Sequence, residues 1–232
     1  MSTLKRERPP PLAAVVEERI REAIVFGELG LGEPISEDRI ATTLGTSRTP
    51  VREALAALQL QRLVVIQPQR GSFVFRPTEQ DVVELAEVRT MLEVEALRLA
   101  HARNRDEALR RMEAAEAKME AAEAVADYRA AAEADAAFHD ALFACAGNSI
   151  LVEAYALISG RIGAMRYFTR RGSAESRRET AGEHRALIAA FARGDLAGAE
   201  RLMKAHVGAV VGRYGEATSA AAPPGDRADA QP

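Results

Sequence analysis

The sequence is poor in the residues that stabilise secreted and membrane proteins. It has one cysteine, Cys145, which rules out an intrachain disulfide and leaves too little sulfur for a thiolate metal cluster. No apolar run approaches the ~18 residues of a membrane span, and no apolar stretch of the kind found in signal peptides follows the charged segment Met1–Arg6. We therefore expect a protein that stays in the cytoplasm and has no membrane partner.

Aromatic residues are scarce as well, since they make up 5% of the chain and tryptophan is missing. Segments rich in alanine, glutamate and arginine take their place, and because these residues favour helix, we expect a mainly α protein. The length of 232 residues suits two ordinary domains. The net charge of −3 divides into 11 Lys/Arg against 9 Asp/Glu in residues 1–76, or +2, and 20 against 25 in residues 77–232, or −5. The N-terminal part is the more basic, but so small a contrast identifies no partner by itself.

Three helices are predicted near the N-terminus. Residues 1–11 end in three prolines and are expected to form a flexible arm, after which residues 12–26 carry apolar side chains at helical spacing. Ser36 can cap a second helix that ends before Gly45, where glycine supplies the left-handed stop. The third helix follows after three residues, which is the connection length of a helix-turn-helix.

The third helix has two distinct faces. Its apolar residues recur at helical spacing and must be buried against neighbouring helices: Val51, Ala54, Leu55 and Leu58. Arg48 and Arg52 lie four residues apart on a face about 90° away from that stripe. Such a helix can dock inward through one face and contact DNA through the other. The alternative is that both arginines are solvated or paired with Glu37 and Glu53.

β-branched and aromatic residues flank a Pro/Gly turn after the third helix. Val64–Ile66 precede the turn and Ser72–Phe75 follow it, which predicts a two-stranded hairpin. A helix-turn-helix followed by a hairpin is a winged helix. Arg70 at the hairpin tip could enter a minor groove or touch phosphates, although an exposed loop arginine is more often merely solvated.

Residues 12–75 resemble the winged-helix domain of the GntR family of bacterial transcription regulators. The resemblance rests on Gly32–Glu37, Ser47–Leu55 and Gly71–Val74, together with apolar positions between them. It implies that side chains on the second helix, the third helix and the wing contact an operator: Arg39, Ser47, Arg48, Thr49, Arg52, Arg70 and Gly71. The family usually has glycine where Arg62 stands, so Arg62 is expected to accept a left-handed conformation at modest cost.

From residue 77 onward the pattern is helix after helix. Thr78 is a predicted cap because Asp81 follows three residues later, Asn148 can cap a later helix, and Val88 belongs to an expected apolar stripe. The C-terminal part should be an all-α bundle of six or seven helices. The expected order is a flexible arm, a winged helix-turn-helix, the helical bundle and a disordered tail: residues 1–11, 12–76, 77–214 and 215–232.

Three histidines and an aspartate in the bundle form a candidate metal site. Asp135 and His139 lie four residues apart, so both side chains point the same way from one helix. His184 and His206 each lie among the apolar residues of a later helix. Three helices could therefore aim one carboxylate and three imidazoles at one point, a donor set that suits zinc, nickel, manganese or iron. The alternative, which the spacing alone favours, is a group of separate core histidines.

Residues 80–214 also resemble the FCD effector domain of the FadR-like branch of the same family. The matching positions include Glu87–Arg89, Asp135 with Phe138 and His139, Gly147–Asn148, His184 and His206. The resemblance implies four ligands for a divalent ion, zinc being expected and nickel, manganese or iron the alternatives: Asp135, His139, His184 and His206. It also implies a pocket in which the metal holds a small carboxylate effector, with four candidate contacts: Arg89, Asn148, Arg161 and Arg166. For Arg89, pairing with Glu93 one turn further on is an equally good explanation.

Taken together, the patterns and resemblances predict a transcription regulator with no catalytic residues. A homodimer would place two winged helices on a palindromic operator in double-stranded DNA, and a small organic acid in the metal-containing bundle would change operator affinity, usually as part of repression. One alternative is a metal-dependent hydrolytic enzyme, since such ligands can activate water, although no general base is evident. Another is a DNA-binding protein whose metal is purely structural.

Overall fold

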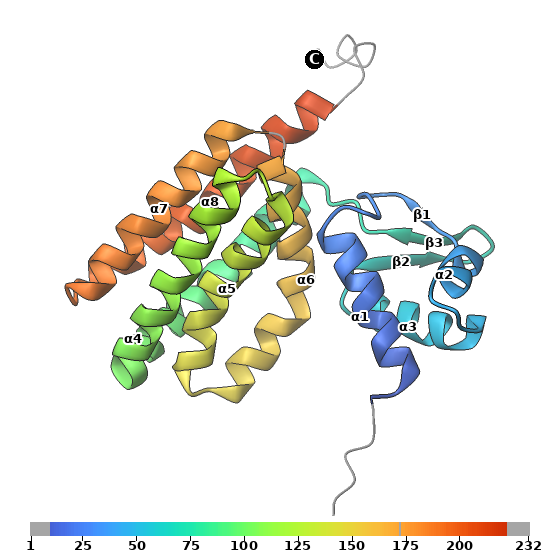
Figure 1. Ribbon diagram of the computed structural model, residues 1–232, viewed down its shortest axis with the longest axis horizontal. Helices are drawn as coiled ribbons and strands as arrows, with labels where there is room; N and C mark the ends of the chain where they lie inside the picture. The colour runs from blue at the N-terminus through green and yellow to red at the C-terminus, as the bar shows by residue number, and fades with distance from the viewer. Residues whose placement is uncertain (1–9, 172, 222–232) are drawn as a thin grey trace, which may run out of the picture. The chain divides into compact units, whose positions relative to one another are not determined.

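The computed structural model describes residues 10–171 and 173–221, and the chain divides into two compact units between Arg76 and Pro77. The described part of the first unit contains three helices and a three-stranded antiparallel sheet of order β1-β3-β2 (Figure 1). The bounds are α1 Leu12–Val25, β1 Pro34–Ile35, α2 Glu37–Thr43, α3 Arg48–Leu60, β2 Val64–Gln67 and β3 Gly71–Val74. Most of the expected N-terminal arm, residues 1–9, lies outside the described residues.

Local sequence signals determine where the helices of the first unit begin and end. The Ser36 hydroxyl accepts a hydrogen bond from the Arg39 amide at 3.2 Å, and Gly45 takes a φ of 62° just after α2. Arg62 has a φ of 54°, the left-handed conformation expected of it. The apolar stripe of α3 is buried: Val51, Ala54, Leu55 and Leu58. The two-residue strand β1 was not predicted, because it is too short to show any periodicity.

The second unit is a bundle of long helices. Their bounds are α4 Glu79–Ala124, α5 Tyr128–Ala146, α6 Ser149–Arg171, α7 Ala174–Ala192 and α8 Leu196–Ala221. Asn104 interrupts α4 with non-helical dihedral angles, so the described part of this unit has six helical segments. The expectation of a disordered tail from residue 215 is wrong for residues 215–221, which continue α8, while residues 222–232 lie outside the described part.

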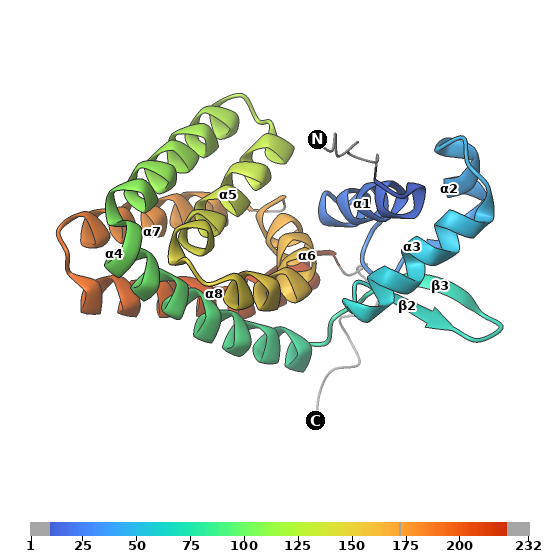
Figure 2. The same cartoon turned by 90° about the horizontal axis from the view of Figure 1, so that it is seen from below.

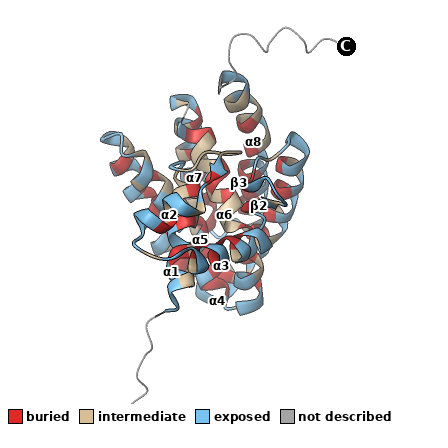
Figure 3. Ribbon diagram, turned by 90° about the vertical axis from the view of Figure 1, so that its right-hand side faces the viewer, coloured by how far each residue is buried: buried red, intermediate tan, exposed pale blue. Residues whose placement is uncertain are grey.

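Helix α5 carries the core of the bundle. More than half of its residues are buried, and it packs against α4 and α6 (Figure 2). Figure 3 shows buried positions alternating with exposed ones along the helices. The buried face of α4 differs from the expected apolar stripe. Val88, which was expected to be buried, is 40% exposed, whereas Arg89 and Glu93 are buried. A polar pair therefore faces the interior. No helix in the described part of the chain is both long and apolar enough to cross a bilayer.

Candidate functional site

The first unit presents a set of exposed polar groups on α2, α3 and the hairpin. Arg48 and Arg52 are 58% and 62% exposed, and each pairs with an acid of α2, Arg48 with Asp38 and Arg52 with Glu37 at 2.7 Å. Pairs so exposed contribute about 0–1 kcal/mol, so either guanidinium can exchange its partner for a phosphate or a base edge. The other residues implied by the family resemblance are also exposed: Arg39, Ser47, Thr49, Arg70 and Gly71.

Three histidines from three helices converge inside the second unit. His139 of α5 and His184 of α7 are fully buried, and His206 of α8 is 5% exposed. One ring nitrogen of each lies within 4.8 Å of the others. The Nε2 atoms of His139 and His206 are 3.3 Å apart, and the Phe138 ring stacks on the ring of His184 with centroids 3.8 Å apart. The three histidines therefore lie together around one point and are not separate in the core.

A different glutamate lies next to the Nδ1 atom of each ring. The Nδ1 atoms lie within hydrogen-bond distance of a carboxylate oxygen: His139 to Glu93 at 2.8 Å, His184 to Glu116 at 3.2 Å and His206 to Glu183 at 2.7 Å. A carboxylate only accepts hydrogen bonds, so Nδ1 carries the proton and Nε2 keeps its lone pair. Such carboxylate–histidine pairs orient metal ligands in many proteins. The arrangement thus presents three lone pairs to one point.

Burial keeps two of these rings uncharged at neutral pH. It lowers the pKa of His139 well below the usual 6.5, with Arg89 adding to the effect. It lowers the pKa of His206 to about 4, although the hydrogen bond that His206 donates to Glu183 acts in the opposite direction. Uncharged imidazole is the form that binds a metal ion. These rings are therefore ready to act as ligands without first losing a proton.

Asp135 lies beside the three rings but is shared with two arginines. Its Oδ1 accepts from Arg170 Nη1 at 2.7 Å and lies 3.8 Å from His184 Nε2, and its Oδ2 is 3.1 Å from Arg166 Nη1. Burial alone would raise the pKa of this carboxyl, but Arg166 and Arg170 hold the pKa well below its usual range. Asp135 is thus ionised and near the histidines, as expected, although arginines occupy its oxygens.

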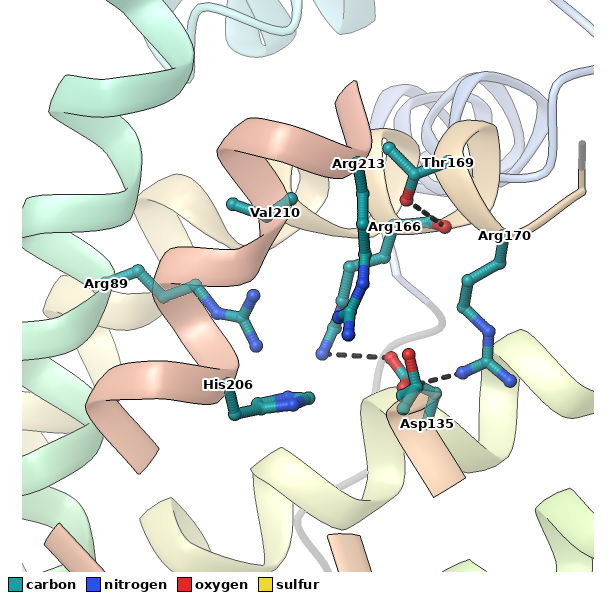
Figure 4. Close-up of a pocket in the computed structure, with 9 residues that line it drawn as sticks. Arg89, Asp135, Arg166, Thr169, Arg170, His206, Val210 and Arg213 are labelled. Carbon is teal, nitrogen blue, oxygen red and sulfur yellow. Dashed lines mark hydrogen bonds and ion pairs between the residues drawn. The ribbon is translucent and has the colours of Figure 1, made fainter. Parts of the chain in front are cut away.

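A small cavity of about 20 Å³ adjoins Asp135 and His206. Four arginines line it, Arg89 from α4, Arg166 and Arg170 from α6, and Arg213 from α8, as Figure 4 shows. The space would hold about one water molecule. So small and cationic a cavity suits an ion or a compact anion rather than an apolar ligand.

The four candidate effector contacts fall into two groups. Arg89 and Arg166 line the cavity, whereas Arg161 and Asn148 are not among its lining residues. Arg161 precedes Arg166 by five residues, which turns its side chain about 140° round α6. The Asn148 side chain caps α6 by accepting from the Leu151 amide at 3.1 Å.

The donor set fits a divalent metal ion. Among the described residues, His184 Nε2 is fully buried and has no hydrogen-bond partner, and the two nearest imidazoles direct lone pairs toward it. A buried acceptor without a partner costs free energy, and a bound cation or a hydrogen-bond donor would remove that cost. Three imidazole nitrogens and a carboxylate form a set that zinc prefers and that nickel, manganese and iron also accept.

Comparison with known proteins accounts for both units. The family model described as "Bacterial regulatory proteins, gntR family" matches residues 12–74, and the model described as "FCD domain" matches residues 84–209. The chain belongs to the GntR family. A "Probable D-xylose utilization operon transcriptional repressor" of Paenarthrobacter nicotinovorans is 34% identical over 208 residues, or 90% of this chain and 91% of that protein. This GntR chain is accordingly a DNA-binding transcription regulator and not an enzyme.

Solved structures of GntR-type proteins share the fold. E. coli McbR/YncC is 22% identical with a TM-score of 0.79, and the match covers 90% of this chain and 99% of that one. A GntR protein from Rhodococcus sp. RHA1 is 24% identical with a TM-score of 0.75, over 88% and 97% of the respective chains. At these identities the likeness concerns the arrangement of helices and strands only.

Proposed function

We propose that this regulator is a repressor that binds a palindromic operator as a homodimer, and that a small carboxylate held by a metal ion in the second unit controls its operator affinity. The supporting observation is the convergence of three buried imidazoles beside a cavity lined by four arginines. A relative that matches 90% of the chain is named as a repressor. An operator as partner places the protein in the cytoplasm, where bacterial DNA lies.

The DNA-binding part of the proposal rests on α3 and the hairpin. The buried stripe of α3 fixes the helix in the unit, and Arg48 and Arg52 remain on its exposed side. Arg70 and Gly71 extend the contact to the wing, where a minor groove or phosphates are within reach. One winged helix covers one half-site, so a symmetric dimer on a palindrome doubles the contacts.

In the metal part of the proposal, His139, His184 and His206 hold the ion with Asp135 as a fourth ligand. Zinc is the first choice, with nickel, manganese and iron as alternatives. A bound ion would supply a Lewis-acidic point of attachment for a carboxylate oxygen. Arg89 and Arg166 line the same cavity and are the proposed effector contacts, whereas Asn148 and Arg161 would need another conformation to reach it.

Arginine variants test the DNA interface. Arg48→Ala and Arg52→Ala should each weaken operator binding by ~1–3 kcal/mol if the side chain contacts a base. Arg19→Ala is the matched control, since Arg19 is an exposed arginine on α1 that pairs with Glu22, three residues further on in the same helix. Operator affinity is measured at fixed salt, because each neutralised phosphate makes binding more salt-dependent. Wild-type affinity in both α3 variants would remove the recognition-helix assignment.

Elemental analysis tests the metal site. Protein purified without chelators or a histidine tag should contain about one zinc or related ion per chain, by the donor set described. The double variant His184→Ala with His206→Ala should lose it, because Asp135 and His139 alone, two ligands of one helix, cannot retain it against buffer. Absence of stoichiometric metal after reconstitution with zinc, nickel and manganese would refute the site. Bound metal combined with operator affinity that no carboxylate alters would make the ion purely structural.

A further inference from the structure

Two acids of α2 hold the two exposed arginines of α3 by one atom each. Glu37 and Asp38 are the first two residues of α2, which begins at the Ser36 cap and packs against α3. The Nε atom of Arg52 donates to a carboxylate oxygen of Glu37 at 2.7 Å. The Nε atom of Arg48 pairs with a carboxylate oxygen of Asp38 in the same way. Both contacts therefore use Nε and not the amino groups at the end of the arginine side chain.

The amino groups of both arginines remain available for another partner. Within the described part of the chain, the Nη1 and Nη2 atoms of Arg48 and Arg52 donate no hydrogen bond. These two amino groups form the fork that donates to O6 and N7 of a guanine in the major groove. Because a guanidinium held at Nε keeps its direction, less side-chain freedom is lost when the fork meets a base. The ion pairs thus prepare both arginines to read guanine.

The other two arginines implied as operator contacts lack such acids. Arg39 of α2 and Arg70 at the hairpin tip are also exposed, but neither side chain has an acidic partner among the described residues. An unpaired guanidinium carries its full charge and suits a phosphate, which DNA of any sequence provides. The charges of Arg48 and Arg52 are balanced by their carboxylates, so these pairs add little to the attraction for the DNA backbone. The four arginines therefore divide into two that favour phosphates and two that favour bases.

We propose that the two acids of α2 determine operator specificity, because they hold the arginines of α3 in the orientation that reads guanine and balance the charge that would attract other DNA. The inference rests on the proposed contact of α3 with the operator, for which it names the base and the positioning residues. Glu37 has the larger part, since its side chain is 30% exposed and that of Asp38 is 64% exposed. A pair that is shielded from water is screened less, and DNA that covers α3 would shield both pairs further.

The spacing of the arginines predicts where the guanines lie. Arg48 and Arg52 are one helical turn apart, or about 6 Å along the axis of α3. This distance corresponds to about two base-pair steps of DNA. Each half-site should therefore contain two guanines, on either strand, that lie within about two base-pair steps of each other.

A purely structural role of the acids makes different predictions. Acids in the first turn of a helix interact favourably with the positive end of the helix dipole, so Glu37 and Asp38 also stabilise α2. If this were their whole role, replacing them would lower the stability of the first unit and would weaken binding to all DNA alike. The proposed role predicts opposite changes for the operator and for other DNA, and affinity measurements with two duplexes separate the two roles.

Glu37→Ala tests the positioning role. The full-length protein is titrated against a palindrome selected from random duplexes and against a duplex of equal length that contains only A·T pairs. The variant should bind the palindrome about three- to tenfold more weakly, a part of what a bidentate arginine–guanine pair contributes. It should bind the A·T duplex more tightly, and the logarithm of this affinity should fall more steeply with the logarithm of salt, by up to about 0.9 in slope, because Arg52 becomes free to neutralise a phosphate. Glu37→Gln keeps an oxygen that accepts from Nε and should recover part of the affinity for the palindrome.

Glu22→Ala is the matched control. Glu22 is an acid of α1 in the same unit that also pairs with an arginine, Arg19, three residues earlier in its own helix. Its replacement should leave both affinities within about twofold of the wild type, as is usual for surface substitutions. Urea unfolding of all variants checks that the first unit stays folded.

Modified operators test the base that each arginine reads. In these operators 7-deazaguanine, which lacks the N7 acceptor, replaces one guanine at a time. The wild type should lose at least about fivefold in affinity at two guanines of each half-site. Glu37→Ala should show a smaller loss at one of these two, because Arg52 no longer reads it well. Arg52→Lys should show a smaller loss at the same guanine although it keeps the charge, since an ammonium cannot offer a planar fork.

The outcomes also distinguish the inference from the proposed function. If Glu37→Ala changes the affinities for the palindrome and the A·T duplex in the same direction, or if 7-deazaguanine has no effect at any position, the inference fails while α3 remains the recognition helix. If Arg48→Ala and Arg52→Ala both keep wild-type operator affinity, the inference and the proposed contact of α3 with DNA fail together.

Discussion

Replacing Glu183 with glutamine should weaken metal binding while leaving the second unit folded. The Glu183 carboxylate accepts from His206 Nδ1 at 2.7 Å and from Arg213 Nη2 at 2.6 Å. The contact with His206 keeps the proton on Nδ1, and it makes the lone pair of Nε2 more basic and so a better ligand for a metal ion. Loss of such a partner typically costs 10- to 100-fold in metal affinity, or about 1.4–2.8 kcal/mol. The effect on folding should be small, because the Glu183 side chain is 30% exposed and a partly solvated pair contributes little.

Glu179→Gln is the matched control for this prediction. Glu179 lies one turn earlier on α7 and also faces Arg213, at 3.4 Å, but its described contacts include none of the three site histidines. Zinc affinity is measured at pH 7.5 by competition with a chromophoric chelator, and urea unfolding of the metal-free proteins checks that both variants fold. Glu183→Gln should fall at least about tenfold below Glu179→Gln in zinc affinity. Equal affinities would refute the argument that the glutamates prepare the histidines for a metal ion.

Three further predictions concern stability. Acid should destabilise the metal-free protein, because burial lowers the pKa of His206 to about 4, whereas the same histidine in the unfolded chain has the usual pKa of 6.5 and so binds a proton between these two pH values. The free energy of unfolding should fall by roughly 3 kcal/mol as the pH falls from 6.5 to 4. Urea titrations that show no such dependence on pH would contradict this prediction. Thr78→Ala should cost about 1 kcal/mol in the same assay, since the hydroxyl accepts from the Asp81 amide at the start of α4; an unchanged unfolding midpoint would show the cap to be dispensable. Zinc should raise the melting temperature and a chelator should lower it, because the ligands come from three helices; a melting temperature indifferent to zinc would contradict this coupling.

Features that depend on near neighbours in the chain could be predicted from the sequence. Ser36, Thr78 and Asn148 each cap the helix that follows, because a capping side chain accepts from an amide only three residues further on. The same short range places Asp135 and His139 on one face of α5. These signals, combined with the two family resemblances, were enough for the fold and for the approximate position of the site.

Features that depend on distant partners could not be predicted. Glu93, Glu116 and Glu183 hold histidines that lie 46, 68 and 23 residues away, and no spacing rule connects residues across helices. Arg170 was missed although it lies one turn after Arg166, a signal that could have revealed it. Arg213 gave no such signal, because its place in the cavity follows from the packing of α8.

The end of α8 shows the same difference between local and tertiary effects. Gly215 and the small residues after it lack a periodic pattern, which suggested disorder from that point. The helix nevertheless continues to Ala221. The Tyr214 hydroxyl donates to the Pro77 carbonyl at 3.0 Å and anchors this part of α8 beside the start of α4. A contact between residues 137 positions apart in the sequence thus stabilises a segment that has only a weak tendency of its own to form a helix.

The most direct test of the account is the operator affinity of one protein preparation in four states: metal-free, with zinc, with a small carboxylate, and with both. The operator is a palindrome selected from random duplexes, and binding is followed by fluorescence anisotropy at fixed salt. The account predicts that zinc or the carboxylate alone changes affinity by no more than a few fold, whereas both together lower it by more than about tenfold, as expected for coupled sites. Equal operator affinity in all four states, with zinc and the carboxylate shown by calorimetry to be bound, would contradict it.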